Sequence, residues 1–165
     1  MLGAEAPLAP PLGLDEGGAS QTEQMEAAMS MTGRCYCGAV RYESDGPPAF
    51  KGQCHCRECQ YISGGAENLF MIVPAAGFRY VEGAPKTFTR SDLESPGTRE
   101  FCAECGTHLT TRSPRDTNIV ILKVGTLDNP ATDYGGPQAV IWTSDAQPYH
   151  LMPEGVPQFP AFPGR

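Results

Sequence analysis

The chain has 165 residues, 40% of them apolar, and a formal net charge of −7. This length suits a single domain, and no stretch comes near the roughly 20 apolar residues that a membrane-spanning helix needs. The acidic balance also disfavours nucleic-acid binding, which needs clustered Lys and Arg. We therefore expect a protein that binds neither membranes nor nucleic acids.

The negative charge is concentrated at the start of the chain. The first 30 residues hold five of the 19 acidic residues and no Lys or Arg. Several prolines there break any helix, apart from a short one that residues 21–31 could form. No basic segment followed by an uninterrupted apolar run marks a secretory signal. We expect residues 1–30 to be a disordered leader of a cytoplasmic protein, and residues 31–162 to be the folded domain.

After residue 32, short runs rich in Val, Ile, Phe, Tyr and Thr alternate with Gly, Pro, Asn and Asp. Such runs are typical of strands, and no segment keeps a helical period over roughly 11 or more residues. The sequence therefore predicts a mainly β fold built on short strands. The runs are Ala39–Glu43, Leu69–Val73, Phe78–Val81, Thr87–Arg90, Thr107–Arg112, Ile119–Val124 and Ala139–Trp142.

All seven cysteines fall into three tight groups. The groups are Cys35-Tyr36-Cys37, Cys54-His55-Cys56-Arg57-Glu58-Cys59 and Cys102-Ala103-Glu104-Cys105. An odd number cannot pair fully in disulfides, and cysteines this close together are better explained as metal ligands. Zinc prefers thiolates and, at a Zn–S distance of about 2.3 Å, places its ligand sulfurs roughly 3.8 Å apart. Gly38 and Gly106 follow two of these groups and permit the backbone bends that this spacing requires.

The number of cysteines suggests how the ligands divide. A closed structural zinc site takes four protein ligands, whereas a catalytic site takes three and keeps one position open. The middle group alone offers three thiolates, and the two outer groups together offer four. The alternative is a second closed site that is completed by His55, His108 or His150. If its segment is extended, His55 points away from Cys54 and Cys56, so the open site is favoured.

Longer patterns surround the cysteines. They are Gly33-x-Cys35-x-Cys37-Gly38-Ala39-Val40-x-Tyr42, Cys54-His55-Cys56-x-x-Cys59 followed by Ser63-Gly64-Gly65, Phe101-Cys102-x-x-Cys105-Gly106-Thr107, Gly125-Thr126-Leu127-Asp128 and Leu151-x-Pro153-x-Gly155-x-Pro157-Gln158-Phe159. Together they resemble the glutathione-dependent formaldehyde-activating enzyme and centromere protein V family, over about residues 33–160.

The resemblance implies a β-tent-like single domain with two zinc ions, one structural and one catalytic. It implies the ligands Cys35, Cys37, Cys102 and Cys105 for the closed structural ion, and Cys54, Cys56 and Cys59 for the open catalytic ion. The implied activity is that of a carbon–sulfur lyase, which joins glutathione or a similar small thiol to formaldehyde or another small aldehyde. A zinc-bound thiol is a thiolate, so this reaction needs no separate protein base.

The sequence also suggests residues that could bind the substrate. Family members often carry a basic residue directly after the third cysteine of the middle group, where this chain has Gln60. The two carboxylates of glutathione need cations or backbone N–H groups, and we expect Arg57 and the turn Ser63-Gly64-Gly65 to supply them. An exposed arginine and an ordinary turn are the alternatives.

Glu58 could act as a proton shuttle, and Phe70 and Trp142 could line a pocket. A surface carboxylate and core packing are the favoured explanations for these residues. The alternative function is a non-catalytic, zinc-stabilised binding module, as the centromere relatives suggest. Its partner would be a protein or chromatin. The 14 acidic and 12 basic residues beyond residue 30 count against direct binding to DNA. Both functions are compatible with an oligomer.

Overall fold

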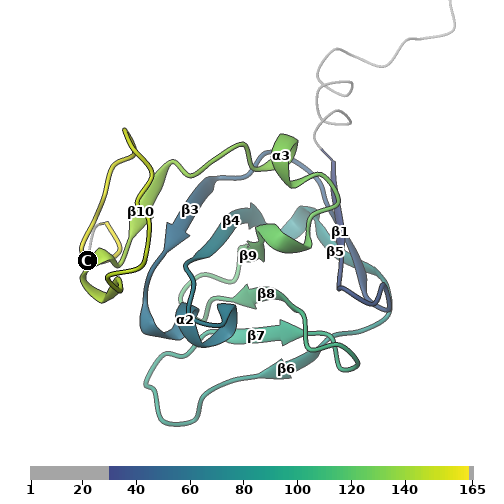
Figure 1. The fold of residues 1–165 in the computed structure, drawn as a ribbon. Helices are drawn as coiled ribbons and strands as arrows, with labels where there is room; N and C mark the ends of the chain where they lie inside the picture. Colours follow the sequence, from purple (N-terminus) through teal and green to yellow (C-terminus); the bar gives the residue numbers. More distant parts are fainter. Residues whose placement is uncertain (1–29, 164–165) are drawn as a thin grey trace, which may run out of the picture.

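The computed structural model describes residues 30–163, which form two β-sheets connected by short helices and loops (Figure 1). Residues 1–29, which hold most of the predicted leader and of its short helix, lie outside the described residues, so these features and the domain bounds 31–162 stay predictions. Met31, the last residue of the predicted helix, belongs to strand β1. The strands of the described part are β1 (Met31–Arg34), β2 (Arg41–Ser44), β3 (Phe50–Cys54), β4 (Asn68–Pro74), β5 (Phe78–Glu82), β6 (Lys86–Phe88), β7 (Thr98–Phe101), β8 (His108–Arg112), β9 (Ile119–Lys123) and β10 (Ala139–Ile141).

The smaller sheet has the strand order β1-β2-β5 and is antiparallel. The larger sheet has the order β10-β3-β4-β9-β8-β7-β6, and only the β10–β3 pair is parallel. The predicted mainly β fold with short strands is therefore confirmed. Strands β1, β3 and β7 were not predicted, because Lys, Arg, Gly and Gln interrupt their apolar pattern.

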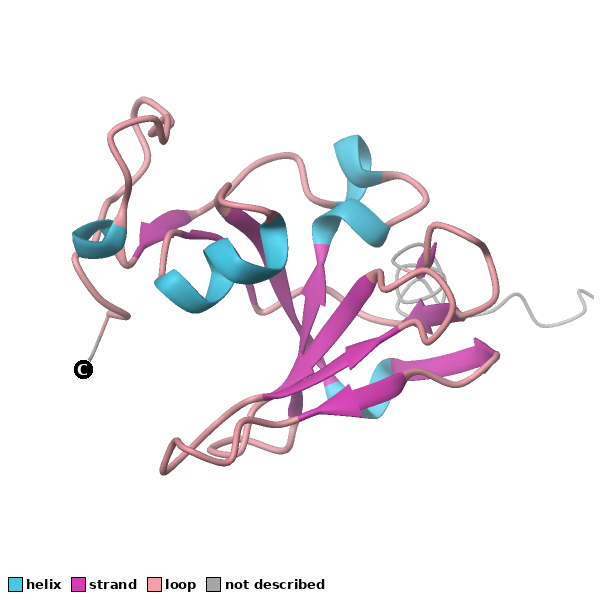
Figure 2. Ribbon diagram, turned by 60° about the horizontal axis from the view of Figure 1, so that its bottom comes forward, coloured by secondary structure: helices cyan, strands magenta, loops and turns pink. Residues whose placement is uncertain are grey.

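The helical segments are short, and Figure 2 shows most of them gathered on one side of the strands. They are α2 (Arg57–Ser63), η1 (Ala75–Gly77), η2 (Val124–Thr126), α3 (Pro130–Asp133) and η3 (Thr143–Asp145). The sequence did not predict α2, since seven residues are too few to establish a helical period. Within residues 30–163, no helix is long and apolar enough to cross a bilayer.

The two faces of the large sheet bury different residues. Along β9, Val120 and Leu122 are fully buried in the main core, which also contains Met71 and Tyr42. Burying each such side chain contributes about 1.5–3 kcal/mol, so this core holds the two sheets together. Because side chains alternate along a strand, Ile121 lies on the opposite face, in a second, smaller apolar cluster.

The register of the large sheet aligns this second face across several strands. Phe70 of β4 pairs with Lys123 of β9, and Ile72 pairs with Ile121. Strand β3 contributes Gly52 opposite Phe70. A side chain at this glycine would place its Cβ 2.6 Å from the Phe70 ring, so only glycine leaves room for that ring.

Candidate metal centres

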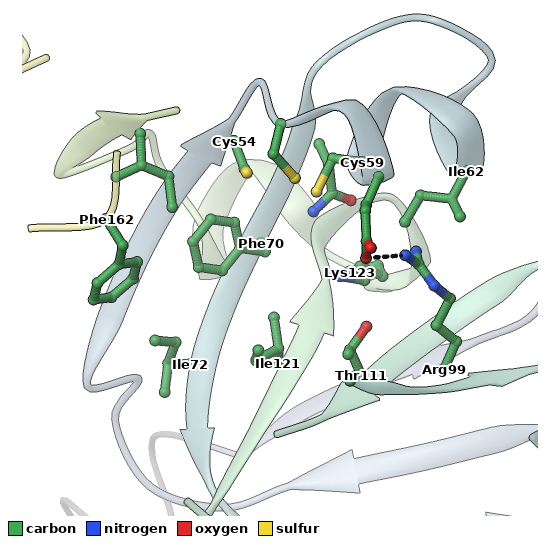
Figure 3. A pocket seen from close by; sticks show the side chains of 15 residues that line it. Cys54, Cys59, Ile62, Phe70, Ile72, Arg99, Thr111, Ile121, Lys123 and Phe162 are labelled. Carbon is green, nitrogen blue, oxygen red and sulfur yellow. Dashed lines mark hydrogen bonds and ion pairs between the residues drawn. The ribbon is translucent and has the colours of Figure 1, made fainter. Parts of the chain in front are cut away.

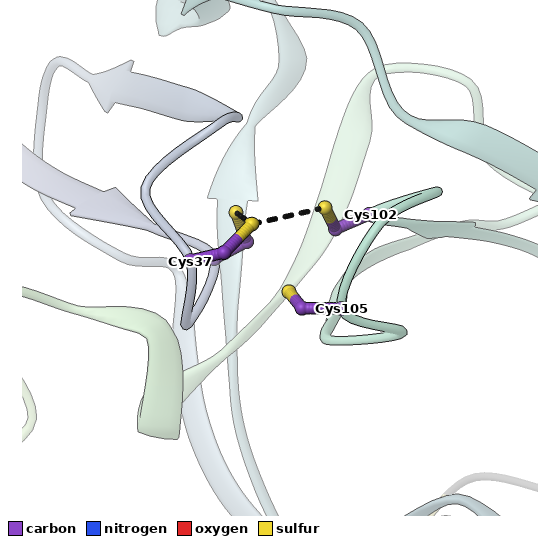
Figure 4. Close-up of side chains that lie close together, drawn as sticks. Cys37, Cys102 and Cys105 are labelled. Carbon is purple, nitrogen blue, oxygen red and sulfur yellow. Dashed lines mark hydrogen bonds between the residues drawn. The ribbon is translucent and has the colours of Figure 1, made fainter.

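The first cluster joins the two sheets through the sulfurs of Cys35, Cys37, Cys102 and Cys105, which all lie within 4.8 Å of one another. Two of the cysteines come from the loop after β1, and two come from the turn between β7 and β8 (Figure 4). The Sγ atoms of Cys35 and Cys37 are 3.5 Å apart, and those of Cys37 and Cys102 are 3.7 Å apart. These separations suit a tetrahedral zinc site, whose sulfurs lie roughly 3.8 Å apart.

Backbone hydrogen bonds fix the shape of both loops around this cluster. The Val40 N–H donates to Cys35 Sγ at 3.3 Å, which disperses the negative charge of a thiolate. Gly106 has φ of +73 and its N–H donates to the Cys102 carbonyl at 3.0 Å. A positive φ favours glycine, so the bend expected at this position is present. The Tyr36 N–H donates to Thr107 Oγ1 at 3.1 Å and ties one loop to the other.

The second cluster comes from one continuous segment. Cys54 ends β3, Cys56 is the N-cap residue of α2, and Cys59 lies in the first turn of that helix. Residues three apart on a helix lie on the same face, and the three sulfurs lie within 4.8 Å of one another. Hydrogen bonds from the Cys54 and Cys59 thiols lower the pKa of Cys56, while burial opposes this shift. These hydrogen bonds favour the thiolate, which is the form that binds a metal.

No histidine belongs to either cluster in the part of the chain that the structure describes. His150 donates from Nε2 to the Gly65 carbonyl at 2.8 Å, so its Nδ1 is an acceptor, for the Gln147 N–H at 3.1 Å and for His55 Nδ1 at 2.9 Å. His108 lies near the Thr110 carbonyl, 2.7 Å from its Nε2. Burial, with a smaller effect of a nearby lysine, lowers the pKa of His108 to about 3, so this ring stays neutral. The closed alternative therefore gains no support within residues 30–163.

Gln60 occupies the position where the family often has a basic residue, and it is 2% exposed. Its Nε2 donates to the carbonyls of His55 at 2.5 Å and of Asp145 at 2.9 Å. Arg57 donates to Gln60 Oε1 and lies over the Tyr61 ring, with its guanidinium carbon 5.2 Å from the ring centre. Gln60 thus connects α2 to η3, whereas Arg57 lies on the exposed side of α2 and lines no wall beside the cysteines.

The turn after α2 uses some of its own hydrogen-bonding groups. Gly64 has φ of +74 and ends the helix, as a glycine at this position commonly does. The Gly65 N–H donates to the Gln60 carbonyl at 2.7 Å, and the Ser63 hydroxyl donates to the Ala66 carbonyl. A role of this turn in binding a carboxylate stays a prediction.

A cavity of about 180 Å³ lies beside the three-cysteine cluster, and Cys54, Cys56 and Cys59 form part of its lining (Figure 3). The cavity lies on the second face of the large sheet, so its walls follow the register described above. Its apolar wall consists of Ile62, Phe70, Ile72, Ile121, Ile141 and Phe162. Phe70 therefore packs in an apolar cluster, as favoured from the sequence, and also lines the pocket.

Two cations face the same cavity. Lys123 is 8% exposed, and its ammonium lies near Cys59 and Cys54. Burial lowers the pKa of Lys123, while the neighbouring Cys59 opposes this shift. Arg99 forms an ion pair with Glu58 at 2.7 Å, and Arg90 pairs with the same carboxylate at 3.2 Å. Glu58 is thus part of a charged wall of the pocket rather than an isolated surface carboxylate.

The sequence analysis did not identify Lys123 or Arg99. One signal was present, since Lys123 lies inside the apolar run Ile119–Val124, and a lysine is rarely buried unless it is paired. No local sequence pattern marks Arg99 as a pocket residue. It comes close to the pocket because β7 pairs with β8, where Arg99 lies opposite Thr111.

The residues of both clusters fit zinc. Thiolates are soft ligands that select zinc over magnesium or calcium, and all seven cysteines are free of disulfides. The second cluster offers three ligands, which matches the number found in catalytic zinc sites. The structure thus contains two cysteine clusters that could hold zinc.

Comparison with known proteins identifies the family of the chain. A family model described as glutathione-dependent formaldehyde-activating enzyme matches residues 30–145. No curated protein matches the chain. Among solved structures, a crystal structure of a protein from Rhodobacter sphaeroides has a TM-score of 0.49 and 20% identity, covering 59% of this chain and 88% of that one.

Proposed function

Because the chain belongs to the glutathione-dependent formaldehyde-activating enzyme family, we propose that it joins glutathione, or a similar small thiol, to formaldehyde or another small aldehyde. The observation that supports this proposal most is the position of the three-cysteine cluster. Its sulfurs lie in the wall of a cavity, and the described residues offer no histidine as a fourth ligand.

In this proposal, Cys54, Cys56 and Cys59 hold the catalytic zinc. Zinc, when bound there, favours the thiolate form of an incoming thiol and thereby makes it a nucleophile at neutral pH. Cys54, Cys56 and Cys59 would supply three ligands to the ion, and the cavity would give a substrate access to its open side. The sulfur–carbon bond forms as the carbonyl π bond breaks, and the thiol proton ends on the former carbonyl oxygen.

The remaining pocket residues balance charge and position the reactants. Three thiolates place a large negative charge in a partly apolar site, and the Lys123 ammonium lies near them. Opposite charges attract strongly where water is scarce, so this ammonium is suited to attract the oxygen that becomes negative during the addition. The apolar wall keeps bulk water away from the reacting atoms, which strengthens these interactions.

We assign the four-cysteine cluster to a structural zinc. Its sulfurs join loops from both sheets, and Cys35 and Cys102 are each 1% exposed. Four ligands from the chain would complete the usual coordination of zinc and leave no position for a substrate. The same zinc chemistry therefore has a different use in the two clusters.

The proposal is tested by measuring glutathione–formaldehyde exchange by NMR, with the zinc-loaded protein and with a protein-free blank. We expect acceleration over the blank that disappears in Cys56→Ser, and zinc analysis giving about two ions per chain in the wild type. Rates equal to the blank, together with two zinc ions that glutathione does not affect, would favour the non-catalytic binding module.

A further inference from the structure

The cavity beside the three-cysteine cluster is more apolar and larger than formaldehyde requires. Ile72 and Ile121 lie opposite each other on neighbouring strands, and Phe70 lies one pair along the same face. An apolar cavity of about 150 Å³ is large enough to bind benzene, and this one has about 180 Å³. Formaldehyde has only two heavy atoms, and since binding energy per heavy atom has a ceiling, it would leave most of this wall uncovered.

A second cavity, of about 570 Å³, adjoins the first and has a different character. The two share Glu58, Ile62 and Arg99, and the second is lined further by Arg90 and Asp92. Glutathione carries two carboxylates and one ammonium at neutral pH. Burying these charges against isoleucine and phenylalanine is costly. Charged residues make up four of the nine that line the second cavity, but only three of the fifteen that line the first. The tripeptide therefore fits the larger, charged cavity better.

This division leaves the apolar cavity to the other reactant. We propose that the carbonyl substrate is an aldehyde with an apolar substituent of about the size of a phenyl ring, which packs against Phe70, Ile72 and Ile121. Its carbonyl oxygen then points toward the Lys123 ammonium, at the end of the wall next to Cys59 (Figure 3). The inference rests on the proposed function, because it names the aldehyde of that same reaction.

The reaction with such an aldehyde remains a simple addition. The thiol sulfur bonds to the aldehyde carbon, the carbonyl π bond breaks, and the thiol proton moves to the oxygen to give a hemithioacetal. No electron acceptor or donor is needed, and no group leaves. The apolar substituent is unchanged, so its only contribution is to hold the carbonyl carbon beside the sulfur.

The test uses the zinc-loaded full chain with benzaldehyde, formaldehyde and the unreactive analogue benzyl alcohol. Each aldehyde is condensed with glutathione, and the rate is divided by that of the protein-free blank. We expect this enhancement to be at least about tenfold larger for benzaldehyde than for formaldehyde. In parallel, binding of benzyl alcohol is measured by NMR titration, which does not depend on catalysis.

Two variants with the same type of substitution locate the binding site. Ile72→Asn places an amide in the apolar wall, and we expect it to weaken benzyl alcohol binding at least about fivefold. Val81→Asn on β5 is the control, since Val81 is 50% exposed and lies outside both cavities; it should leave this binding unchanged. Zinc content and melting temperature show whether each variant is folded.

The outcomes separate the two proposals. Condensation of formaldehyde without a preference for benzaldehyde, and without binding of benzyl alcohol, would overturn the inference and leave the proposed function standing. Equal weakening by Ile72→Asn and Val81→Asn would also overturn it, because binding would then not depend on this wall. If neither aldehyde condenses faster than in the blank, the proposed function fails and the inference fails with it.

Discussion

The two cysteine clusters are built from the same ligand type but in opposite ways. The four-cysteine cluster joins loops that are far apart in the sequence, since Cys37 and Cys102 are 65 positions apart. The three-cysteine cluster comes from six consecutive positions at the end of β3 and the start of α2. A cross-link between distant loops restricts the unfolded chain strongly, whereas a local one hardly does. The first arrangement therefore suits stability, and the second suits chemistry.

The surroundings of the two clusters also differ, because the first is closed by hydrogen bonds and the second is open to a cavity. Around the first, hydrogen bonds such as that from Tyr36 to Thr107 close the loops on each other. Around the second, one side faces a cavity that also contains Lys123 and Arg99. Each of the following experiments changes one side of this comparison.

The largest effect is expected from Cys102→Ser, which removes a ligand from the four-cysteine cluster. Structural zinc contributes about 10–16 kcal/mol, whereas a domain of this kind has a total stability of about 5–15 kcal/mol. We therefore expect the variant to unfold, as monitored by circular dichroism and thermal melting. A soluble variant that unfolds cooperatively after losing one zinc ion would argue against a structural role.

Cys56→Ser should instead separate activity from folding. We expect a folded protein that has lost one of its two zinc ions and catalyses exchange no faster than the blank. Zinc analysis and the exchange assay, with a melting curve as the control for folding, measure this directly. Behaviour like that of Cys102→Ser would show that the three-cysteine cluster is needed for folding as well.

Lys123→Met tests the positive charge beside the three sulfurs. Removing a group that stabilises developing negative charge commonly costs about 10²–10³ in rate, and we expect kcat/KM to fall by about that factor. The melting temperature should change little, because the cost of burying the ammonium offsets the loss of its attraction to the nearby thiolates. The control is Lys86→Met on β6, an exposed lysine outside both cavities. A full rate in Lys123→Met would exclude the lysine from the reaction.

Gln60→Glu tests the connection between α2 and η3. The substitution keeps the size but removes the N–H groups that donate to the His55 and Asp145 carbonyls. Leaving buried acceptors unpaired costs about 1–3 kcal/mol, which urea denaturation can measure. Gln138→Glu is a matched control, since its Oε1 accepts from the Lys51 N–H and a carboxylate oxygen would still do so. Equal stability of the two variants would contradict this role of Gln60.

The smallest effect is expected from deleting residues 1–28. If these residues form a disordered leader, they make no stabilising contacts, and the melting temperature should stay almost unchanged. A large decrease in a thermal melt would mean that this segment packs on the domain.

The features that the sequence predicted best are those that depend on residues close together along the chain. The spacing within each cysteine group indicated metal ligands, and the turn at Gly106 followed from the need for a positive φ. Strands such as β4 and β9 were recognisable because they consist almost entirely of apolar residues. The resemblance to the family, confirmed by the match over residues 30–145, added the expected chemistry.

What the sequence could not predict depends on pairing between distant strands. The pocket forms because Phe70 lies opposite Lys123 and Ile72 opposite Ile121, and no local pattern gives that register. Arg99 reaches the pocket through two further strand pairings for the same reason. The short helix α2 escaped prediction because its seven residues are too few to establish an apolar period.

The most direct test of the account is a crystal structure of the zinc-loaded protein with glutathione, with data collected at the zinc absorption edge. The account predicts two zinc ions, and the sulfur of glutathione about 2.3 Å from the one held by Cys54, Cys56 and Cys59. A fourth ligand from the chain itself on that ion, such as an imidazole or a carboxylate that remains in place with glutathione present, would contradict it.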